Sequence, residues 1–303
     1  MKTFIGITGT TCVGKSEVAV ELAKLLNTQV ISADSMQIYK GMDIGTAKIT
    51  KQEMDGIAHW MLDIVEPNQD YSAHLYQQQA SKIINNMDSI PIVAGGTGLY
   101  FQSLVYPPEF GCVSNEIREE LKDLLKEKGL SCLQELLKQL DKDSYSSIDL
   151  CNPVRVMRAI EIAKSGGALR SQGKGNVNPQ FSCLLFVLET DRSVLYEKIN
   201  QRVDKMMDQG LLQEVKRLVD KYGYCQTSAF NAIGYKEIIE YLKGNCTLEE
   251  AVEQIKINSR HYAKRQITYF KKLKVTQFVN VDNLSSKQVA QYIYQQIVDK
   301  INQ

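Results

Sequence analysis

The chain has 303 residues, enough for one large domain or two smaller ones with a substantial buried core. Hydrophobic residues make up 44% and charged residues 23%, as in soluble proteins, and no apolar run approaches the roughly 18 residues of a membrane-spanning helix. The 36 lysines and arginines nearly cancel the 35 aspartates and glutamates, which argues against nucleic-acid binding over the whole surface.

The N-terminus passes directly into a predicted apolar strand at residues 4–8, without the cationic region or cleavage site of a secretory signal. The seven cysteines form no CxxC pair, so we interpret them as free thiols of a reducing compartment. We therefore expect a cytoplasmic protein with no membrane partner, and we expect it to be a monomer.

The first strand ends in a glycine-rich loop that fits the Walker A pattern, and a helix is predicted directly after it at residues 15–26. Glycines let backbone N–H groups point at an anion, and the helix N-terminus adds about half a positive charge. Lys15 offers a full charge to the terminal phosphates, and Ser16 offers a hydroxyl ligand for Mg²⁺. The predicted phosphate site comprises Gly9, Thr10, Thr11, Cys12, Val13, Gly14, Lys15 and Ser16.

Two further strands are predicted at residues 29–34 and 90–94, with a helix between them. Strands separated by helices pair in parallel, so we expect an α/β fold with a P-loop NTPase-like, doubly wound parallel sheet. Ligands collect at the carboxyl ends of such strands, where Asp34, Ser35 and Thr97 should lie. The Asp34 carboxylate could ligate magnesium, act as a general base or cap the next turn.

The pattern changes after residue 108. Amphipathic helices are predicted at residues 116–128, 131–140 and 153–164 with no strand between them, and a glycine-rich stretch ends this region near residue 175. Strands return at residues 183–188 and 277–281, again with helices between them. We expect residues 1–111 and 181–303 to form the catalytic core, and residues 112–180 to form a small all-helical insertion domain.

A predicted C-terminal helix carries a cluster of cations. Residues 254–274 contain seven lysines and arginines and no acidic residue, and Lys256, Arg260 and Lys264 share one helical face. The opposite face is an apolar stripe that includes Tyr262. The cluster of cations favours a surface that binds the phosphate backbone of RNA. The alternative is an ordinary solvated helix face.

Motifs along nearly the whole chain resemble the tRNA dimethylallyltransferase, or tRNA isopentenyltransferase, family. The most specific is the run DSMQIYKGMDIGTAK at residues 34–48. Other matches are GGTGLY at residues 95–100, IGYKE at 233–237 and AKRQIT at 263–268. The phosphate loop departs from the family's usual pattern by Thr10 in place of proline and Cys12 in place of alanine.

The resemblance implies transfer of a dimethylallyl group from dimethylallyl diphosphate to the N6 amine of the adenosine 3′ of the anticodon. The acceptors would be tRNAs reading codons that begin with U, Mg²⁺ would be required, and diphosphate would be released. The P-loop would then hold the prenyl donor rather than spend ATP. Asp34 would deprotonate the adenine amine, Thr97 would hold the base, and Lys15 would stabilise the leaving group. The target base would flip out of its stack.

The resemblance also implies contacts with the anticodon stem-loop of tRNA. They comprise Asp34, Ser35, Met36, Gln37, Thr97, Arg118, Val154, Arg155, Val156, Met157, Arg158, Asn231, Ala232, Ile233, Gly234, Tyr235, Lys236, Arg260, Lys264 and Arg265. Arg202 either reaches the donor phosphates or is an exposed surface charge. Tyr235 either stacks on RNA or belongs to the core.

Two other functions share parts of this pattern. One is an isopentenyltransferase that uses free adenine nucleotides, and the other is a small-molecule P-loop kinase. The helical insertion and the cationic helix favour a macromolecular acceptor, because a nucleotide needs neither. The long match at residues 34–48 argues against a kinase.

Overall fold

A computed structural model describes residues 1–106, 115–165, 179–273 and 277–301. The chain divides into two compact units, one formed by Met1–Val105 with Gln180–Gln303 and the other by Tyr106–Pro179. The boundary that we expected at residues 111 and 112 and most of the glycine-rich stretch lie outside the described residues. No described helix has both the length and the apolar character needed to cross a membrane.

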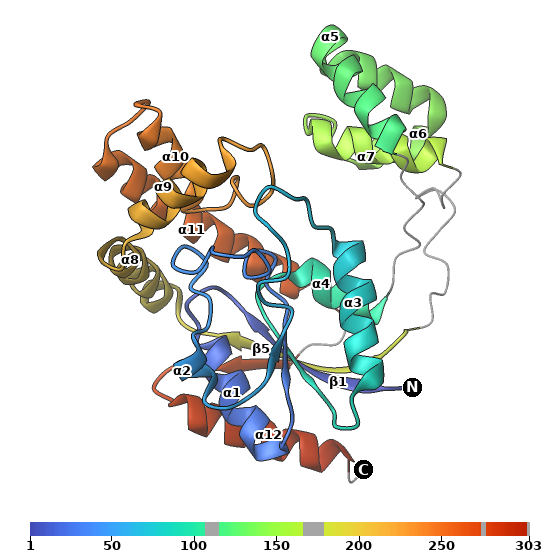
Figure 1. Cartoon of the computed structure of the whole chain (residues 1–303). Helices are drawn as coiled ribbons and strands as arrows, with labels where there is room; N and C mark the ends of the chain where they lie inside the picture. The colour runs from blue at the N-terminus through green and yellow to red at the C-terminus, as the bar shows by residue number, and fades with distance from the viewer. Residues whose placement is uncertain (107–114, 166–178, 274–276, 302–303) are drawn as a thin grey trace. The chain divides into compact units, whose positions relative to one another are not determined.

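The first unit is built on a sheet of six parallel strands in the order β3-β2-β4-β1-β5-β6 (Figure 1). The strands are β1 (Thr3–Gly9), β2 (Val30–Ser32), β3 (His59–Trp60), β4 (Ile92–Ala94), β5 (Ser182–Glu189) and β6 (Gln277–Asn280). The doubly wound α/β fold is thereby confirmed. Strand β3 was not predicted, because two residues are too few to show an alternating pattern.

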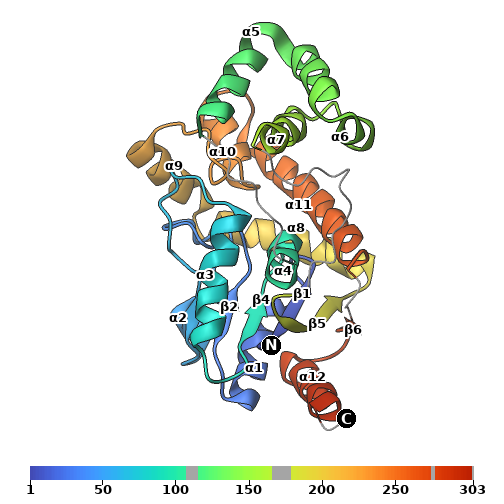
Figure 2. The same cartoon turned by 90° about the vertical axis from the view of Figure 1, so that its right-hand side faces the viewer.

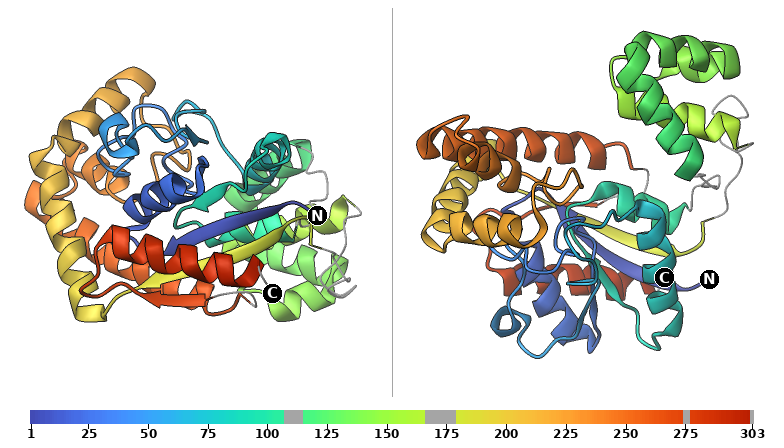
Figure 3. Two further views of the ribbon diagram at one scale, coloured as in Figure 1. Left: turned by 90° about the horizontal axis from the view of Figure 1, so that it is seen from below. Right: turned by 45° about the horizontal axis from the view of Figure 1, so that its top comes forward.

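Helices cover both faces of this sheet. On one face lie α1 (Lys15–Leu26) and α12 (Ser286–Ile301), side by side in Figure 3. There Leu22 and Ile293 pack with Ile5 of β1. The other face carries α3 (Ala73–Asn86) and α4 (Gly98–Val105), where Phe101 packs with Phe4. Neighbouring residues of β1 thus serve opposite faces, as the pleat of a strand requires.

A second layer of helices lies at one end of the sheet (Figure 2). It consists of α8 (Arg192–Asp208), α9 (Leu211–Tyr222), α10 (Tyr235–Leu242) and α11 (Leu248–Phe270). These helices share a core cluster with Ile38, Tyr39 and Met42 from the loop after β2. The loop that follows β2, which includes the short helix α2 (Lys51–Met54), is therefore anchored to the helices as well as to the sheet.

The second unit is helical and has a core of its own. It contains α5 (Asn115–Leu140), α6 (Lys142–Ser147) and α7 (Pro153–Lys164), drawn in green in Figure 1. Gly129 interrupts α5 with a left-handed φ of 76°, which is the break predicted between residues 128 and 131. Val156 of α7 is 0% exposed and packs in this core, so the expected contact of its side chain with RNA is wrong.

Candidate active site

The phosphate loop joins β1 to α1 through backbone that glycine favours. Gly9 has a φ of 143°, and a Cβ there would lie 2.3 Å from the carbonyl oxygen of Leu188. Gly14 has a φ of 88° and precedes α1 without a side-chain cap. The first N–H groups of α1 therefore have no side-chain acceptor from the capping position, and they remain available to an anion.

Lys15 is the cation of this loop. Its Nζ donates a hydrogen bond to the carbonyl oxygen of Thr10 at 2.5 Å. Burial lowers the pKa of Lys15 from 10.5 to about 8; the charge of Asp34 opposes this shift and that of Arg202 adds to it. A bound diphosphate would favour the charged form, because opposite charge raises the pKa of an amine.

Arg202 reaches the loop from α8. One guanidinium nitrogen donates to the hydroxyl of Thr11 at 3.1 Å, and the other donates to the carbonyl oxygen of Thr46 at 3.3 Å. The side chain is half-buried and lines the same cavity as Lys15. Of our two interpretations, the structure therefore favours a phosphate contact over a free surface charge.

Only one oxygen of the Asp34 carboxylate accepts hydrogen bonds from the described residues. Oδ1 accepts hydrogen bonds from the backbone N–H groups of Met36 at 2.9 Å and Gln37 at 3.4 Å, so Asp34 caps the turn after β2. Oδ2 has no hydrogen-bond partner among the described residues. Asp34 therefore caps the turn and keeps a free oxygen for chemistry.

Thr97 joins the ends of two strands. Its hydroxyl accepts a hydrogen bond from the backbone N–H of Ser35 at 3.0 Å and donates one to the Ser35 hydroxyl at 3.3 Å. The backbone N–H of Thr97 also donates to the carbonyl oxygen of Ala33 at 3.1 Å. Thr97 thus holds the segment that carries Asp34 against the end of β4.

Two residues of α11 complete the site, and sequence reasoning missed both. Gln266 is buried; its Nε2 donates to the carbonyl oxygen of Gly96 and its Oε1 accepts from the N–H of Thr11, both at 2.9 Å. Tyr262 lines the same cavity as Asp34, and burial raises the pKa of its phenol, as does the charge of Asp34. In the helical pattern Tyr262 looked like a core position, whereas the AKRQIT motif at residues 263–268 was an available signal for Gln266.

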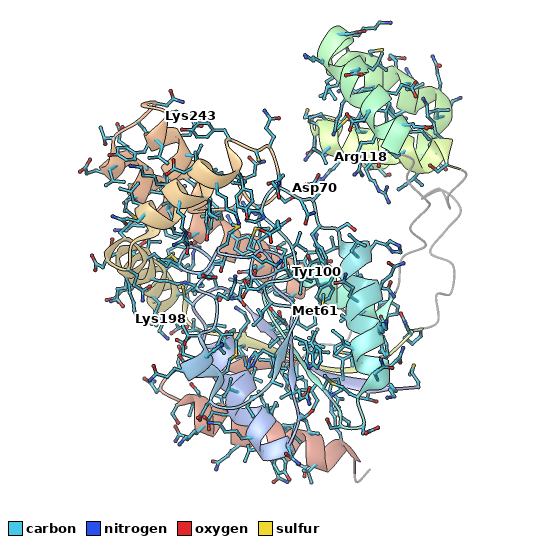
Figure 4. The ribbon with its side chains drawn as sticks, in the orientation of Figure 1. Met61, Asp70, Tyr100, Arg118, Lys198 and Lys243 are labelled. Atoms are coloured by element: carbon cyan, nitrogen blue, oxygen red, sulfur yellow. The ribbon has the colours of Figure 1, made fainter. Side chains whose placement is uncertain are left out.

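The phosphate loop, Asp34, Arg202, Tyr262 and Gln266 line one cavity of about 490 Å³, a volume typical of small-molecule sites, whereas Thr97 is not among its lining residues. The phosphate loop forms one wall, and Asp34, Gln37, Arg202 and Tyr262 form others. The cavity continues past Lys198 of α8, which is labelled in Figure 4. Phosphate-binding groups and a carboxylate with a free oxygen therefore face the same space.

The chemistry of the loop also fits a magnesium ion. Mg²⁺ takes oxygen ligands and usually keeps several waters and substrate phosphates, so it needs only one or two protein ligands. The exposed Ser16 lines the cavity and can supply one such oxygen. Among the described residues no three His, Cys, Asp or Glu side chains gather into a metal site, so an ion would depend on the phosphates of the ligand.

The cations of α11 divide into two groups. Lys256 lies 2.6 Å from Asp204 of α8, and Arg260 lies 3.2 Å from Glu253. Our expectation that this cationic face lacks acidic partners is wrong for these two: Asp204 comes from a distant part of the sequence, and Glu253 directly precedes residues 254–274. Lys264 and Arg265 are exposed and form no ion pair within the described part of the chain.

Of the six residues at 231–236, Tyr235 departs most from our expectation. Its ring is 1% exposed and its hydroxyl donates to Oε1 of Glu214 at 2.6 Å, so the core interpretation is correct and stacking on RNA is wrong. Ala232 is buried and Ile233 is half-buried. Asn231 and Lys236 are exposed, and Gly234 adopts a φ of 97°.

In the helical unit, two of the predicted RNA contacts bind an acidic side chain. Arg118 (labelled in Figure 4) and Arg158 lie 2.9 Å and 3.1 Å from Glu161, which is 2% exposed. Their guanidinium groups thus satisfy a buried carboxylate of α7. Val154 and Arg155 of the same helix are exposed, whereas Met157 packs partly against the core.

Comparison with known proteins leads to one family. Residues 37–273 match the family model described as IPP transferase, and residues 2–69 match the one described as isopentenyl transferase. A curated tRNA dimethylallyltransferase of Clostridioides difficile (strain 630) is 43% identical, with 93% of this chain and 94% of that protein covered.

Solved structures agree with the sequence matches. The full-length tRNA isopentenylpyrophosphate transferase of Bacillus halodurans superposes with a TM-score of 0.76 at 37% identity and covers 100% of this chain and 97% of its own. A eukaryotic dimethylallyltransferase solved acting on tRNA gives a TM-score of 0.86 at 28% identity, with 99% and 80% covered.

Proposed function

The chain belongs to the IPP transferase family, whose similar curated members are tRNA dimethylallyltransferases, and we propose that it transfers a dimethylallyl group to tRNA. The donor is dimethylallyl diphosphate, and the acceptor is the N6 amine of the adenosine 3′ of the anticodon. One observation carries this proposal: the phosphate loop and the free oxygen of Asp34 face the same cavity.

In this function the diphosphate lies against the N–H groups of the phosphate loop, Lys15 and Arg202. The N6 nitrogen attacks C1 of the dimethylallyl group, the C1–O bond breaks, and its electron pair leaves with the diphosphate. Oδ2 of Asp34 accepts the proton that N6 loses. Lys15 and Arg202 stabilise the charge that grows on the departing diphosphate, usually the largest contribution in such sites.

Mg²⁺ would be held by the Ser16 hydroxyl and the donor's phosphate oxygens, where it supplies further positive charge for the leaving group. The acceptor base reaches the cavity after leaving its stack; Gln37 lines this cavity, and Thr97 holds the segment that carries Asp34.

The acceptor separates this function from its closest alternative, an isopentenyltransferase that uses free adenine nucleotides. We would incubate the protein with labelled dimethylallyl diphosphate and undermodified tRNA, with AMP, ADP and ATP in parallel reactions. We expect label only in tRNA, at the adenosine beside the anticodon. Label in a nucleotide but not in tRNA would contradict the proposal, and label in no acceptor would leave the kinase alternative.

A further inference from the structure

Glu214 of α9 is a buried carboxylate, 3% exposed, that binds the backbone of the loop after β2. Oε2 accepts hydrogen bonds from the N–H groups of Asp43 at 3.0 Å and Ile44 at 2.9 Å. Oε1 accepts from the N–H of Gly45 at 3.1 Å and from the hydroxyl of Tyr235 at 2.6 Å. These donors occupy the acceptor capacity of one carboxylate.

The hydrogen bonds of Glu214 determine the backbone conformation of the loop after β2 more than they increase the stability of the fold. Burying a carboxylate is unfavourable unless donors satisfy it, and here three consecutive amides converge on it, as backbone nests do on anions. An apolar side chain at position 214 would avoid that cost, but it would leave the three N–H groups without an acceptor.

The residues directly after these amides hold two side chains of the candidate site. The carbonyl oxygen of Thr46 accepts hydrogen bonds from Arg202 at 3.3 Å and from Nε2 of Gln37 at 3.4 Å. The carbonyl oxygen of Ala47 accepts from the same Nε2 at 3.2 Å. The positions of these carbonyls follow from where Glu214 holds the preceding amides.

Tyr235 confines the loop from another side. A Cβ at Gly45 would lie 2.5 Å from the Tyr235 ring, so backbone and ring are in direct contact. Tyr235 is also held by its hydrogen bond to Glu214. The hydrogen bonds to the Glu214 carboxylate and the contact with the Tyr235 ring together fix the backbone conformation of residues 43–45.

We propose that Glu214 is a positioning residue for the transfer reaction. It fixes the loop whose carbonyls orient Arg202 toward the donor's diphosphate and Gln37 toward the acceptor, and it touches neither substrate itself. The inference rests on the proposed function, because that function assigns the roles of Arg202 and Gln37.

The test substitutes Glu214→Gln, which retains the shape but replaces one acceptor oxygen by an NH₂ group facing backbone donors. We expect the KM for dimethylallyl diphosphate and the KM for tRNA each to rise by about tenfold or more, and kcat to fall as well, because Arg202 also stabilises the charge on the departing diphosphate. Hydrogen exchange at residues 43–47 should become faster, because the loop amides lose their acceptor.

Val215→Ala is the matched control. Val215 is the next residue of α9, is 0% exposed and packs in the same helical core, but forms none of the hydrogen bonds to the loop. This variant should lower Tm and leave both KM values and the exchange at residues 43–47 unchanged. An equal rise in KM for Val215→Ala would overturn the inference, because general destabilisation would then explain both variants.

Wild-type KM values in Glu214→Gln would also overturn it. If that variant does not fold, Tyr235→Phe removes one donor and keeps the carboxylate, and we expect a smaller rise in both KM values; no rise would contradict the inference. Absence of transfer by the wild-type protein would instead refute the proposed function, while hydrogen exchange would still report whether Glu214 holds the loop.

Discussion

Asp34 uses its two carboxylate oxygens for different purposes. Oδ1 caps the turn through the N–H of Met36, and Oδ2 has no partner among the described residues. Replacement by alanine would remove both oxygens and mix a local structural defect with a chemical one. Asparagine can still accept the hydrogen bond from Met36 but cannot accept a proton, so it separates the two contributions.

We predict that Asp34→Asn lowers kcat by about 10²- to 10⁴-fold, the usual contribution of a general base. The Kd for tRNA should stay within about threefold of the wild-type value, because an amide at position 34 preserves the capped turn. Single-turnover kinetics and filter binding measure the two quantities. A variant that loses tRNA affinity but keeps its rate of transfer would show that Asp34 is structural.

Sequence predicts the site best where its residues lie in local motifs, and it left the role of Arg202 open. Lys15 and Ser16 follow from the spacing of the phosphate loop, and Asp34 from its place after a strand. Gln266 and Glu214 come from helices more than 160 residues away from the loops they bind. Each occupies a polar position in a helical pattern that would be ordinary on a surface; the AKRQIT motif was a signal for Gln266, whereas no motif marked Glu214.

At the scale of elements, α11 contributes to both the site and the exposed surface. Its buried face supplies Gln266 to the site, and its exposed cations differ in whether they form ion pairs. Lys256 and Arg260 are paired with Asp204 and Glu253, whereas Lys264 and Arg265 form no ion pair within the described ranges. Paired cations release fewer counterions on binding RNA, so the second pair should dominate electrostatic binding.

We predict that Lys264→Ala with Arg265→Ala reduces the slope of log K against log salt for tRNA binding by about 1.4, which is 0.7 per lost contact with single-stranded phosphates. The matched double variant Lys256→Ala with Arg260→Ala should change this slope by less than about 0.5, since its cations are already paired. Equal slopes for the two variants would mean that the ion pairs do not decide which cations meet RNA.

At the scale of the whole molecule, the parallel sheet explains why distant segments meet at one site. The alternation of strands and helices was enough to predict it, because each long apolar strand shows its pattern locally. The sequence pattern did not predict β3, because this strand is too short to show a pattern. It also did not predict α4, because the glycines at residues 95–98 obscure the helical pattern there. The helical unit was recognised by its lack of strands, and its core confirms that it packs on itself.

In the proposed function, the phosphate loop holds a prenyl diphosphate as the leaving group and does not spend ATP. The most direct test measures diphosphate released against dimethylallyl groups joined to tRNA, in reactions that contain Mg²⁺ and no ATP. We predict one diphosphate for each transferred group and no increase in rate when ATP is added. Transfer that requires ATP, or diphosphate release without transfer to tRNA, would contradict it.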